Sequence, residues 1–215
     1  MLESWKKIID TNILKLIYEK EEEEKKNNLK IFPNYENIFK AFTYFELNQL
    51  KVVIIGQDPY HQINQATGLA FGINNSKIPP SLKNIANELF NDLNIKLKDY
   101  TLESWAKQGI LLLNSALTVQ EGKPGSHMKL WNKFTDNIIE NINKLDNIIF
   151  VAWGAFAHKK LQNINLNKHY LIVSSHPSPL SNFKQYGIYP SFNNSKPFSK
   201  INNYLKKLDT DEICW

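Results

Sequence analysis

Four short runs of aliphatic residues stand apart along the chain, and each is followed by polar residues. They are Val52–Ile55, Ile110–Leu113, Ile148–Val151 and Tyr170–Val173. Continuous apolar runs of this length are typical of strands that are buried on both faces of a parallel sheet. Because helical patterns separate the runs, the sequence predicts an α/β fold, a three-layer α/β/α sandwich with a central four-stranded parallel sheet.

Helical periodicity predicts the elements that cover this sheet. The expected helices are Ser4–Glu24, Tyr35–Phe45, Ser81–Leu93 with Ser81 as its N-cap, Leu102–Lys107, Met128–Lys144, Ala155–Gln162 and about Ser199–Leu208. The charged stretch Glu19–Lys26 is expected to face solvent. We find no internal repeat and no linker, so we expect a single domain over residues 1–215, with residues 1–30 as a helical, charged N-terminal extension.

Composition narrows the class of protein. The 215 residues are 42% hydrophobic and 22% charged, which excludes a globally disordered chain. No apolar run approaches the ~18 residues of a membrane helix, and the N-terminus lacks an apolar signal core, so we expect an intracellular protein without a membrane partner. The single cysteine, Cys214, excludes an internal disulfide and a Cys-rich zinc site.

The formal net charge is +5, and every one of the 26 cations is Lys. Through Lys30 the chain carries equal numbers of Lys and acidic residues, so the whole excess lies downstream. Such an excess suits a polyanion, because Lys–phosphate contacts release counterions, and it equally suits a surface kept basic for solubility. Without Arg, phosphates have to be bound by Lys, hydroxyls and backbone N–H groups.

Polar or otherwise unusual residues follow all four predicted strands. They are Gly56–His61, Asn114, Trp153-Gly154 and His176–Ser181. Each alone has a structural explanation, such as an Asp-Pro turn, an Asn that closes a strand or a structural His. Because the carboxyl ends of parallel strands meet at one edge of a sheet, their joint occurrence predicts a ligand site there.

These segments resemble the signature segments of the uracil-DNA glycosylase family. The likeness extends from about Lys51 to Lys207 and includes 64–71, 105–114 and 131–136. It implies a DNA base-excision repair enzyme that flips uracil out of single- or double-stranded DNA and hydrolyses its N-glycosidic bond, leaving an abasic site. It further implies that the reaction needs neither a metal nor an organic cofactor.

The resemblance assigns the two catalytic roles to Asp58 and His176. Breaking the bond between uracil N1 and deoxyribose C1′ leaves positive charge on the sugar and negative charge on the base, so the enzyme must stabilise both. By this likeness, Asp58 holds the water and stabilises the sugar cation. His176 then donates a hydrogen bond to uracil O2.

Four further residues resemble the uracil-binding residues of the family. Asn114 would accept from uracil N3–H and donate to O4, a pattern that cytosine reverses. Tyr60 would fill the space beside C5 and thereby exclude the methyl group of thymine. Phe71 would stack on the base, and Gln57 would contribute mainly through its backbone.

The resemblance also implies a set of DNA contacts. Leu180 corresponds to the apolar wedge that enters the space left by the flipped base. The serine hydroxyls would grip phosphates, and the prolines between them would stiffen the loops. The full set is Pro79, Pro80, Ser81, Gly154, Ser178, Leu180 and Ser181.

The sequence departs from the family pattern in four places. Ala155 stands where Ser is common, Lys184 lies near a position often held by Arg, and Leu130 stands where Gly is usual. Residues 185–196 replace a short Phe-Phe-Gly stretch and are expected to form a surface insertion.

Two alternative functions stay open at this point. One is a catalytically weak DNA-binding subunit of a polymerase, which the intact Asp58 and His176 oppose. The other is a metal-dependent nuclease, which needs clustered ligands, whereas these loops offer one Asp and well-separated His61 and His176. We expect a monomer, and we regard residues 1–30 and 185–196 as candidate contacts for a replication protein.

Overall fold

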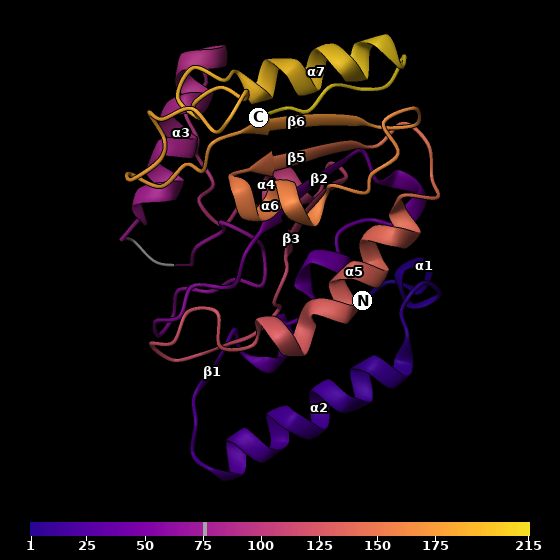
Figure 1. Cartoon of the computed structure of the whole chain (residues 1–215), viewed down its shortest axis with the longest axis vertical. Coiled ribbons are helices and arrows are strands. Elements are labelled where there is room, and N and C mark those ends of the chain that lie inside the picture. The colour runs from indigo at the N-terminus through magenta and orange to yellow at the C-terminus, as the bar shows by residue number, and fades with distance from the viewer. Residues whose placement is uncertain (75–76) are drawn as a thin grey trace.

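A four-stranded parallel sheet forms the centre of the computed structural model, which describes residues 1–74 and 77–215 (Figure 1). Its strands are β2 (Val52–Gly56), β3 (Ile110–Asn114), β5 (Ile149–Trp153) and β6 (Tyr170–Ser174). They lie in the order β3-β2-β5-β6, and each neighbouring pair is parallel. Every residue of β2, β3 and β5 is buried, which explains the uninterrupted apolar runs.

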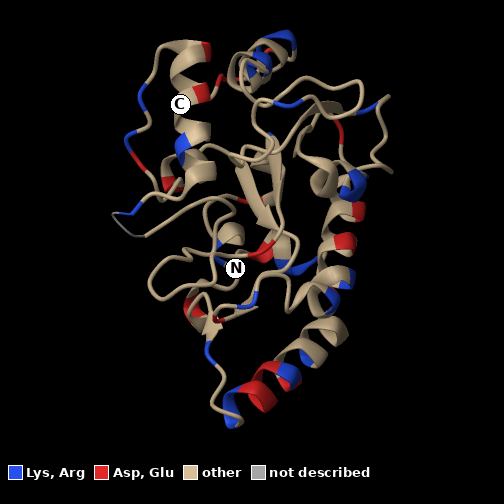
Figure 2. Cartoon of the chain, turned by 60° about the vertical axis from the view of Figure 1, so that its left-hand side comes forward, with Lys and Arg blue, Asp and Glu red and all other residues tan. Residues whose placement is uncertain are grey.

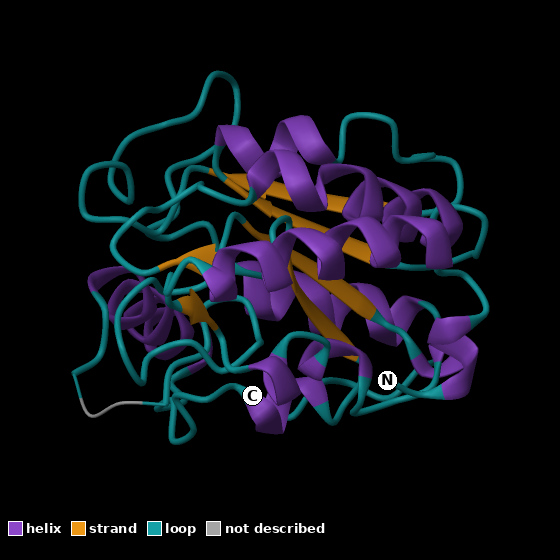
Figure 3. Ribbon diagram, turned by 90° about the horizontal axis from the view of Figure 1, so that it is seen from below, coloured by secondary structure: helices purple, strands orange, loops and turns teal. Residues whose placement is uncertain are grey.

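Helices cover both faces of the sheet, so that the strands lie between two groups of helices (Figure 3). Right-handed crossovers put the β2-to-β3 connection on one face and the connections from β3 to β5 and from β5 to β6 on the other. The predicted three-layer α/β/α sandwich is therefore confirmed. The helices are α1 (Glu3–Lys6), α2 (Thr11–Lys26), α3 (Pro80–Leu93), α4 (Glu103–Ala106), α5 (Met128–Ile142), α6 (Ala155–Lys160) and α7 (Pro197–Lys207).

Aromatic side chains tie each helical layer together. On one face, Trp105 of α4 packs edge to face against Phe198 of α7, with ring centroids 5.6 Å apart. On the other, Trp131 and Phe134 of α5 pack edge to face at 5.2 Å, and Phe39 contacts both rings. Such pairs add to the stability that their buried area already provides.

The N-terminal segment forms two helices, so the prediction of one helix over Ser4–Glu24 is wrong. The break lies at Asp10, whose backbone is extended and whose carboxylate accepts a hydrogen bond from the Asn12 N–H at 2.9 Å. Asp is a favourable N-cap, and this cap starts α2 even though the apolar periodicity runs through the break. The new helix then packs against α5.

Trp5 of α1 is fully buried, and its indole N–H donates to the backbone oxygen of Phe45 at 2.7 Å. The expected extension, residues 1–30, therefore contributes a side chain to the hydrophobic core. The single-domain organisation stays a prediction.

The charged stretch of α2 is only partly exposed. Lys and acidic residues are concentrated on this helix, at the bottom of Figure 2, and Glu19, Lys20, Glu22, Glu23, Lys25 and Lys26 are exposed. Glu21 and Glu24, however, are only 2% and 6% exposed, so the expectation of a solvated stretch is wrong for these two residues.

Two local predictions are wrong, and one short pair of strands was not predicted. Residues expected as a helix over Tyr35–Phe45 form the 3₁₀ turns η1 (Tyr35–Asn37) and η2 (Lys40–Phe42), followed by η3 (Leu47–Gln49). The N-cap of α3 is Pro79, and Pro80 is its first residue, because proline is pre-organised for that position. The two-residue strands β1 (Ile31–Phe32) and β4 (Val119–Gln120) form an antiparallel pair too short to give a recognisable sequence pattern.

Among the helices of the described residues, none is both long and apolar enough to cross a membrane.

Candidate active site

The topology of the sheet points to one crevice. The chain leaves β2 toward β3 and leaves β5 toward β6, which lie on opposite sides, so the strand order reverses between β2 and β5. Ligands of open α/β sheets bind at such a switch point, beyond the carboxyl ends of the strands. Gln57 and Asp58 follow β2, and Gly154 follows β5.

A cavity of about 210 Å³ opens at this crevice. Both predicted catalytic residues, Asp58 and His176, line it. All four predicted uracil-binding residues line it too, together with one of the predicted DNA contacts: Gln57, Tyr60, Phe71, Asn114 and Ser81. The structure thus brings together side chains from segments that are far apart in the sequence.

Asp58 is partly buried, and one of its oxygens is held in place. Its Oδ2 accepts a hydrogen bond from the Gly125 N–H at 2.5 Å. Burial raises the pKa of Asp58, while the Gly125 N–H and the charge of a protonated His61 act in the opposite direction. The second carboxylate oxygen, Oδ1, makes no hydrogen bond within the described residues and is available to a ligand.

His176 is held in one tautomer. Its Nδ1 accepts a hydrogen bond from the backbone N–H of Ser178 at 3.0 Å. Because a backbone N–H can only donate, Nδ1 carries no proton, and the proton of the neutral ring is on Nε2. Burial lowers the pKa of His176, which favours the neutral ring.

Asn114 ends β3 and presents an amide to the cavity. Its side chain makes no hydrogen bond within residues 1–74 and 77–215, although the residue is only 5% exposed. It lies opposite Gly56 in the β2–β3 register, and a Cβ at Gly56 would lie within 2.3 Å of its Oδ1. Glycine is therefore required at position 56 for this amide to occupy its place.

Phe71 has a backbone conformation that bulky residues rarely adopt. Its φ is 64°, in the left-handed region, and such strain persists only where the surroundings impose it. Its ring packs edge to face on Trp153 at 5.3 Å, and its carbonyl accepts from the Tyr60 hydroxyl at 3.4 Å. Burial raises the pKa of Tyr60, so its hydroxyl stays neutral.

Of the predicted DNA contacts, Ser81 lines the cavity, and Ser178, Leu180 and Ser181 follow the lining residue His176 in the same loop. Ser178 and Ser181 lie with their hydroxyl oxygens 3.2 Å apart, and Leu180 between them is 80% exposed. Ser81 lies in the first turn of α3 behind Pro79 and Pro80.

Gly154 lies against His176. Its φ is 94°, and a Cβ there would lie 2.8 Å from the Cβ of His176. The close approach of β5 to His176 therefore depends on the missing side chain at this position.

Sequence reasoning missed a buried polar network behind Asp58. His127 is 3% exposed; its Nε2 is 2.9 Å from Oε2 of Glu24, and its Nδ1 is 2.7 Å from Oγ1 of Thr118. The indole N–H of Trp131 donates to the same Thr118 oxygen at 2.7 Å. His127 is two residues from Gly125, so the network anchors the loop that holds Asp58. The partners Glu24 and His127 are 103 residues apart in the sequence, and no local pattern links them.

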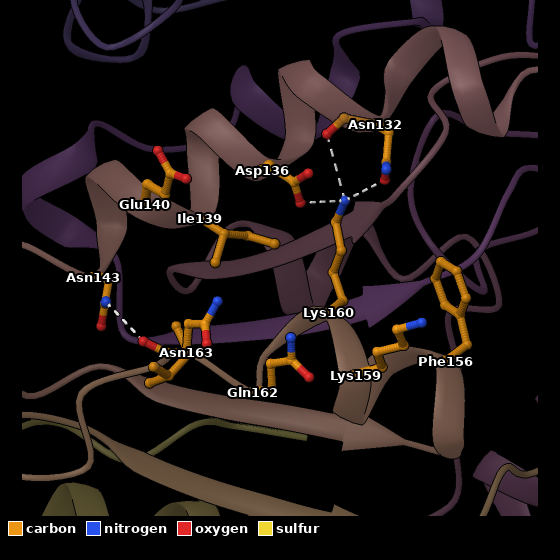
Figure 4. A pocket seen from close by; sticks show the side chains of 11 residues that line it. Asn132, Asp136, Ile139, Glu140, Asn143, Phe156, Lys159, Lys160, Gln162 and Asn163 are labelled. Carbon is orange, nitrogen blue, oxygen red and sulfur yellow. Dashed lines mark hydrogen bonds and ion pairs between the residues drawn. The ribbon is translucent and has the colours of Figure 1, made fainter.

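A larger pocket, of about 490 Å³, lies between α5 and α6 (Figure 4). There the Lys160 ammonium contacts Asp136 at 2.6 Å and Asn132 Oδ1 at 2.8 Å. None of the predicted site residues lines this pocket, so size alone does not identify the active site. Within the part of the chain that the structure describes, no three His, Cys, Asp or Glu side chains cluster as metal ligands would.

Comparison with known proteins agrees with this geometry. A sequence model of the family described as "Uracil DNA glycosylase superfamily" matches residues 42–206. A uracil-DNA glycosylase of Aliarcobacter butzleri is 47% identical over 220 residues, which cover 99% of this chain and 100% of that protein. One from Buchnera aphidicola is 46% identical over 191 residues, or 86% of this chain and 83% of that protein.

Solved structures give the same result. The crystal structure of mimivirus uracil-DNA glycosylase superposes with a TM-score of 0.84 at 33% identity, covering 99% of this chain and 89% of that one. The chain therefore belongs to the uracil-DNA glycosylase superfamily, and its activity is the hydrolytic excision of uracil from DNA in base-excision repair.

Proposed function

We propose that Asp58 and His176 act on opposite ends of the glycosidic bond that breaks. One observation carries this proposal: both side chains line a single small cavity, one as a carboxylate and the other as a neutral ring with its proton on Nε2. An anion on one side and a donor on the other match the charges that develop on the sugar and the base.

In the proposed reaction, the C1′–N1 bond breaks, and its electron pair leaves with uracil. The negative charge spreads to O2, where the Nε2–H of His176 donates a hydrogen bond. Asp58 stabilises the cationic sugar and orients a water molecule, whose oxygen bonds to C1′. The proton that this water loses passes by way of Asp58 to solvent, and the uracil anion takes up one proton from solvent, so the products are free uracil and an abasic deoxyribose.

Asn114, Tyr60 and Phe71 select the base in this proposal. The amide of Asn114 has no other hydrogen-bond partner in the described residues, so a base that cannot pair with it leaves it unsatisfied. Tyr60 blocks a methyl group at C5, and the strained backbone of Phe71 supports its role as the stacking surface. Gln57 acts through its backbone; its carbonyl accepts from the Ala116 N–H at 2.9 Å.

The DNA grip is proposed to surround the cavity. The exposure of Leu180 supports its role as the wedge, and the paired hydroxyls of Ser178 and Ser181 support phosphate binding. Ser81 behind Pro79-Pro80, and the backbone at Gly154, complete the set. The base-flipping step costs a few kcal/mol for unstacking and unpairing, which these contacts offset.

One experiment tests the activity and its competitors together. The protein is incubated, with EDTA present, with oligonucleotides that carry a single uracil, thymine or cytosine, and alkali then cleaves any abasic site. We expect strand breaks only with uracil. Tight binding without breaks would instead support a non-catalytic DNA-binding subunit, and activity abolished by EDTA would support a metal-dependent nuclease.

We further propose a monomer that acts inside the cell wherever DNA is replicated. A replication protein is the proposed partner of residues 1–30 or of the insertion 185–196. In the insertion, Tyr186 and Tyr189 form an isolated antiparallel bridge and leave Ile188 93% exposed. Sedimentation of the protein alone tests the first point. Pull-down with Leu16→Ser in the N-terminal segment or Ile188→Ser in the insertion, both at exposed positions, tests the second.

A further inference from the structure

A further pocket, of about 550 Å³, opens between α3 and the segment that follows Ser181. Its lining combines two kinds of side chain, amides and aromatic rings. The residues that matter below are Asn84, Asn87 and Phe90 of α3, with Asn182 and Phe183 on the opposite wall. Nothing in the mechanism above uses this pocket.

One wall of the pocket carries an unsatisfied amide. Asn182 is only 4% exposed, and its Oδ1 is buried without a hydrogen-bond partner in the described residues. The backbone holds this residue in place, because its N–H donates to the Ser178 carbonyl at 2.9 Å and its carbonyl accepts from the Asn193 N–H at 2.8 Å. Leaving such a group unpaired costs free energy, which is typical of a site built for a ligand.

The aromatic residues of the pocket are exposed rather than packed away. Phe183 is 73% exposed and Phe90 is 43% exposed, although both are large apolar residues. Exposed aromatic rings are the usual platforms on which the bases of a nucleic-acid strand stack. Amide side chains, which offer both a donor and an acceptor, pair with the edges of bases.

The pocket is continuous with the proposed DNA grip. Asn182 directly follows Ser181, and Asn84 lies one helical turn after Ser81 on the same face of α3. The Asn84 amide donates to the Pro177 carbonyl at 2.8 Å, which joins the two walls beside the active site. Among the described residues that line the pocket, Lys96 alone is charged, and its positive charge suits a polyanionic strand.

From these observations we propose that the pocket binds a nucleobase of the substrate strand that flanks the uracil. The base stacks on Phe183 and Phe90, and its edge is bound by the amides of α3 and Asn182. This inference rests on the proposed function, because it needs the strand to be gripped by Ser81 and Ser181. It assigns to this enzyme a contact with a second base, beyond the flipped one.

Spacer scanning tests the inference. Single-stranded oligonucleotides with one deoxyuridine carry an abasic spacer at each flanking position in turn, and kcat/KM is measured with the full chain. We expect one position at which the spacer lowers kcat/KM by about 5- to 100-fold, the range of base–aromatic stacking. In Phe183→Ser the penalty at that position should disappear, while penalties elsewhere stay as in the original protein.

Two further variants keep the test decisive. Asn87→Ala removes an exposed amide of the pocket and should reduce the same penalty, whereas Leu166→Ser, an exposed apolar residue outside the pocket, should change none. A uniform spacer profile, or a position-specific penalty that survives in Phe183→Ser, would overturn the inference. If the unaltered protein released no uracil from any oligonucleotide, the proposed function itself would fail instead.

Discussion

The backbone N–H of Ser178 donates a 3.0 Å hydrogen bond to Nδ1 of His176, and this bond determines which ring nitrogen is protonated. A neutral donor suits the reaction, because uracil leaves as an anion and needs a hydrogen bond rather than a full proton transfer. The loop His176–Ser181 therefore orients the His176 ring through its own backbone, and no carboxylate of the described residues forms a hydrogen bond with this ring.

The tautomer of His176 can be observed directly. In ¹⁵N NMR spectra at pH 7, we expect Nδ1 of His176 to be unprotonated and Nε2 to carry the proton. Because burial lowers the pKa of this ring, its titration should occur below the ordinary value of about 6.5. A proton on Nδ1, or titration at or above the ordinary value, would contradict the role proposed for this residue.

Asp58→Asn should lower turnover without lowering the thermal stability of the folded protein. Turnover should fall by about 10² or more, because the anion that stabilises the sugar cation is lost, while the Kd for DNA changes little. The pKa of Asp58 is raised in the folded state, so folding becomes less favourable as pH rises from the unfolded pKa through the folded one. Removing this charge should therefore leave the Tm at pH 7 unchanged or higher. A lower Tm with normal turnover would refute both points.

The same carboxylate predicts the acidic limb of the pH profile. The proposed mechanism needs ionised Asp58, so kcat/KM should fall as pH decreases through the pKa of Asp58, which burial raises above the ordinary Asp value of about 3.9. A protonated His61 opposes this rise, and so His61→Gln should move the limb to higher pH. A limb that does not move would show that His61 carries no charge near Asp58.

The preference for uracil over cytosine should depend on Asn114 and on Gly56, which lies opposite it. Asn114→Asp should reduce the ratio of kcat/KM for uracil over cytosine, since the amide donor is lost. Gly56→Ala should do the same, because the new Cβ would lie 2.3 Å from the place of Asn114 Oδ1 and displace it. The measurement is kcat/KM on matched oligonucleotides, and an unchanged preference in Gly56→Ala would mean that the amide position is not critical.

The buried network behind Asp58 should affect kcat more than KM. Glu24→Leu removes the partner of His127 and loosens the loop of Gly125, so we expect kcat to fall about 10- to 100-fold and the acidic limb to shift to higher pH. Glu24→Gln retains an acceptor oxygen and should restore much of the activity. Glu23→Leu, at an exposed neighbouring position, is the control. A loss of stability without a change in kcat or in the pH limb would leave Glu24 a purely structural residue.

The sheet and the main site residues were predictable for a common reason. A strand buried on both faces has to be apolar throughout, and the residues that interrupt this pattern at the carboxyl ends converge by topology. Asp58, Asn114 and His176 were found in this way, and the family resemblance then suggested their roles. The cavity brings these three together, as expected.

Other features were not predictable because they depend on distant contacts or single hydrogen bonds. The periodicity of residues 4–24 cannot reveal the cap at Asp10 that breaks the helix. Glu24 belongs to a charged stretch that would be solvated in isolation, and only the fold brings His127 to it. Likewise, the tautomer of His176 depends on the conformation of the loop and not on the identity of its residues.

Gly154 affects both the proposed DNA contact and the position of His176, so a substitution there cannot change one without the other. The backbone proposed to contact a phosphate at Gly154 lies against Cβ of His176, the proposed hydrogen-bond donor to uracil, and a methyl group at Gly154 would lie only 2.8 Å from that Cβ. Any attempt to strengthen the grip on DNA by adding a side chain here would push the imidazole off its target. Stronger DNA binding and faster uracil excision therefore compete at position 154. Variants that bind DNA more tightly have to be sought at positions that do not contact His176.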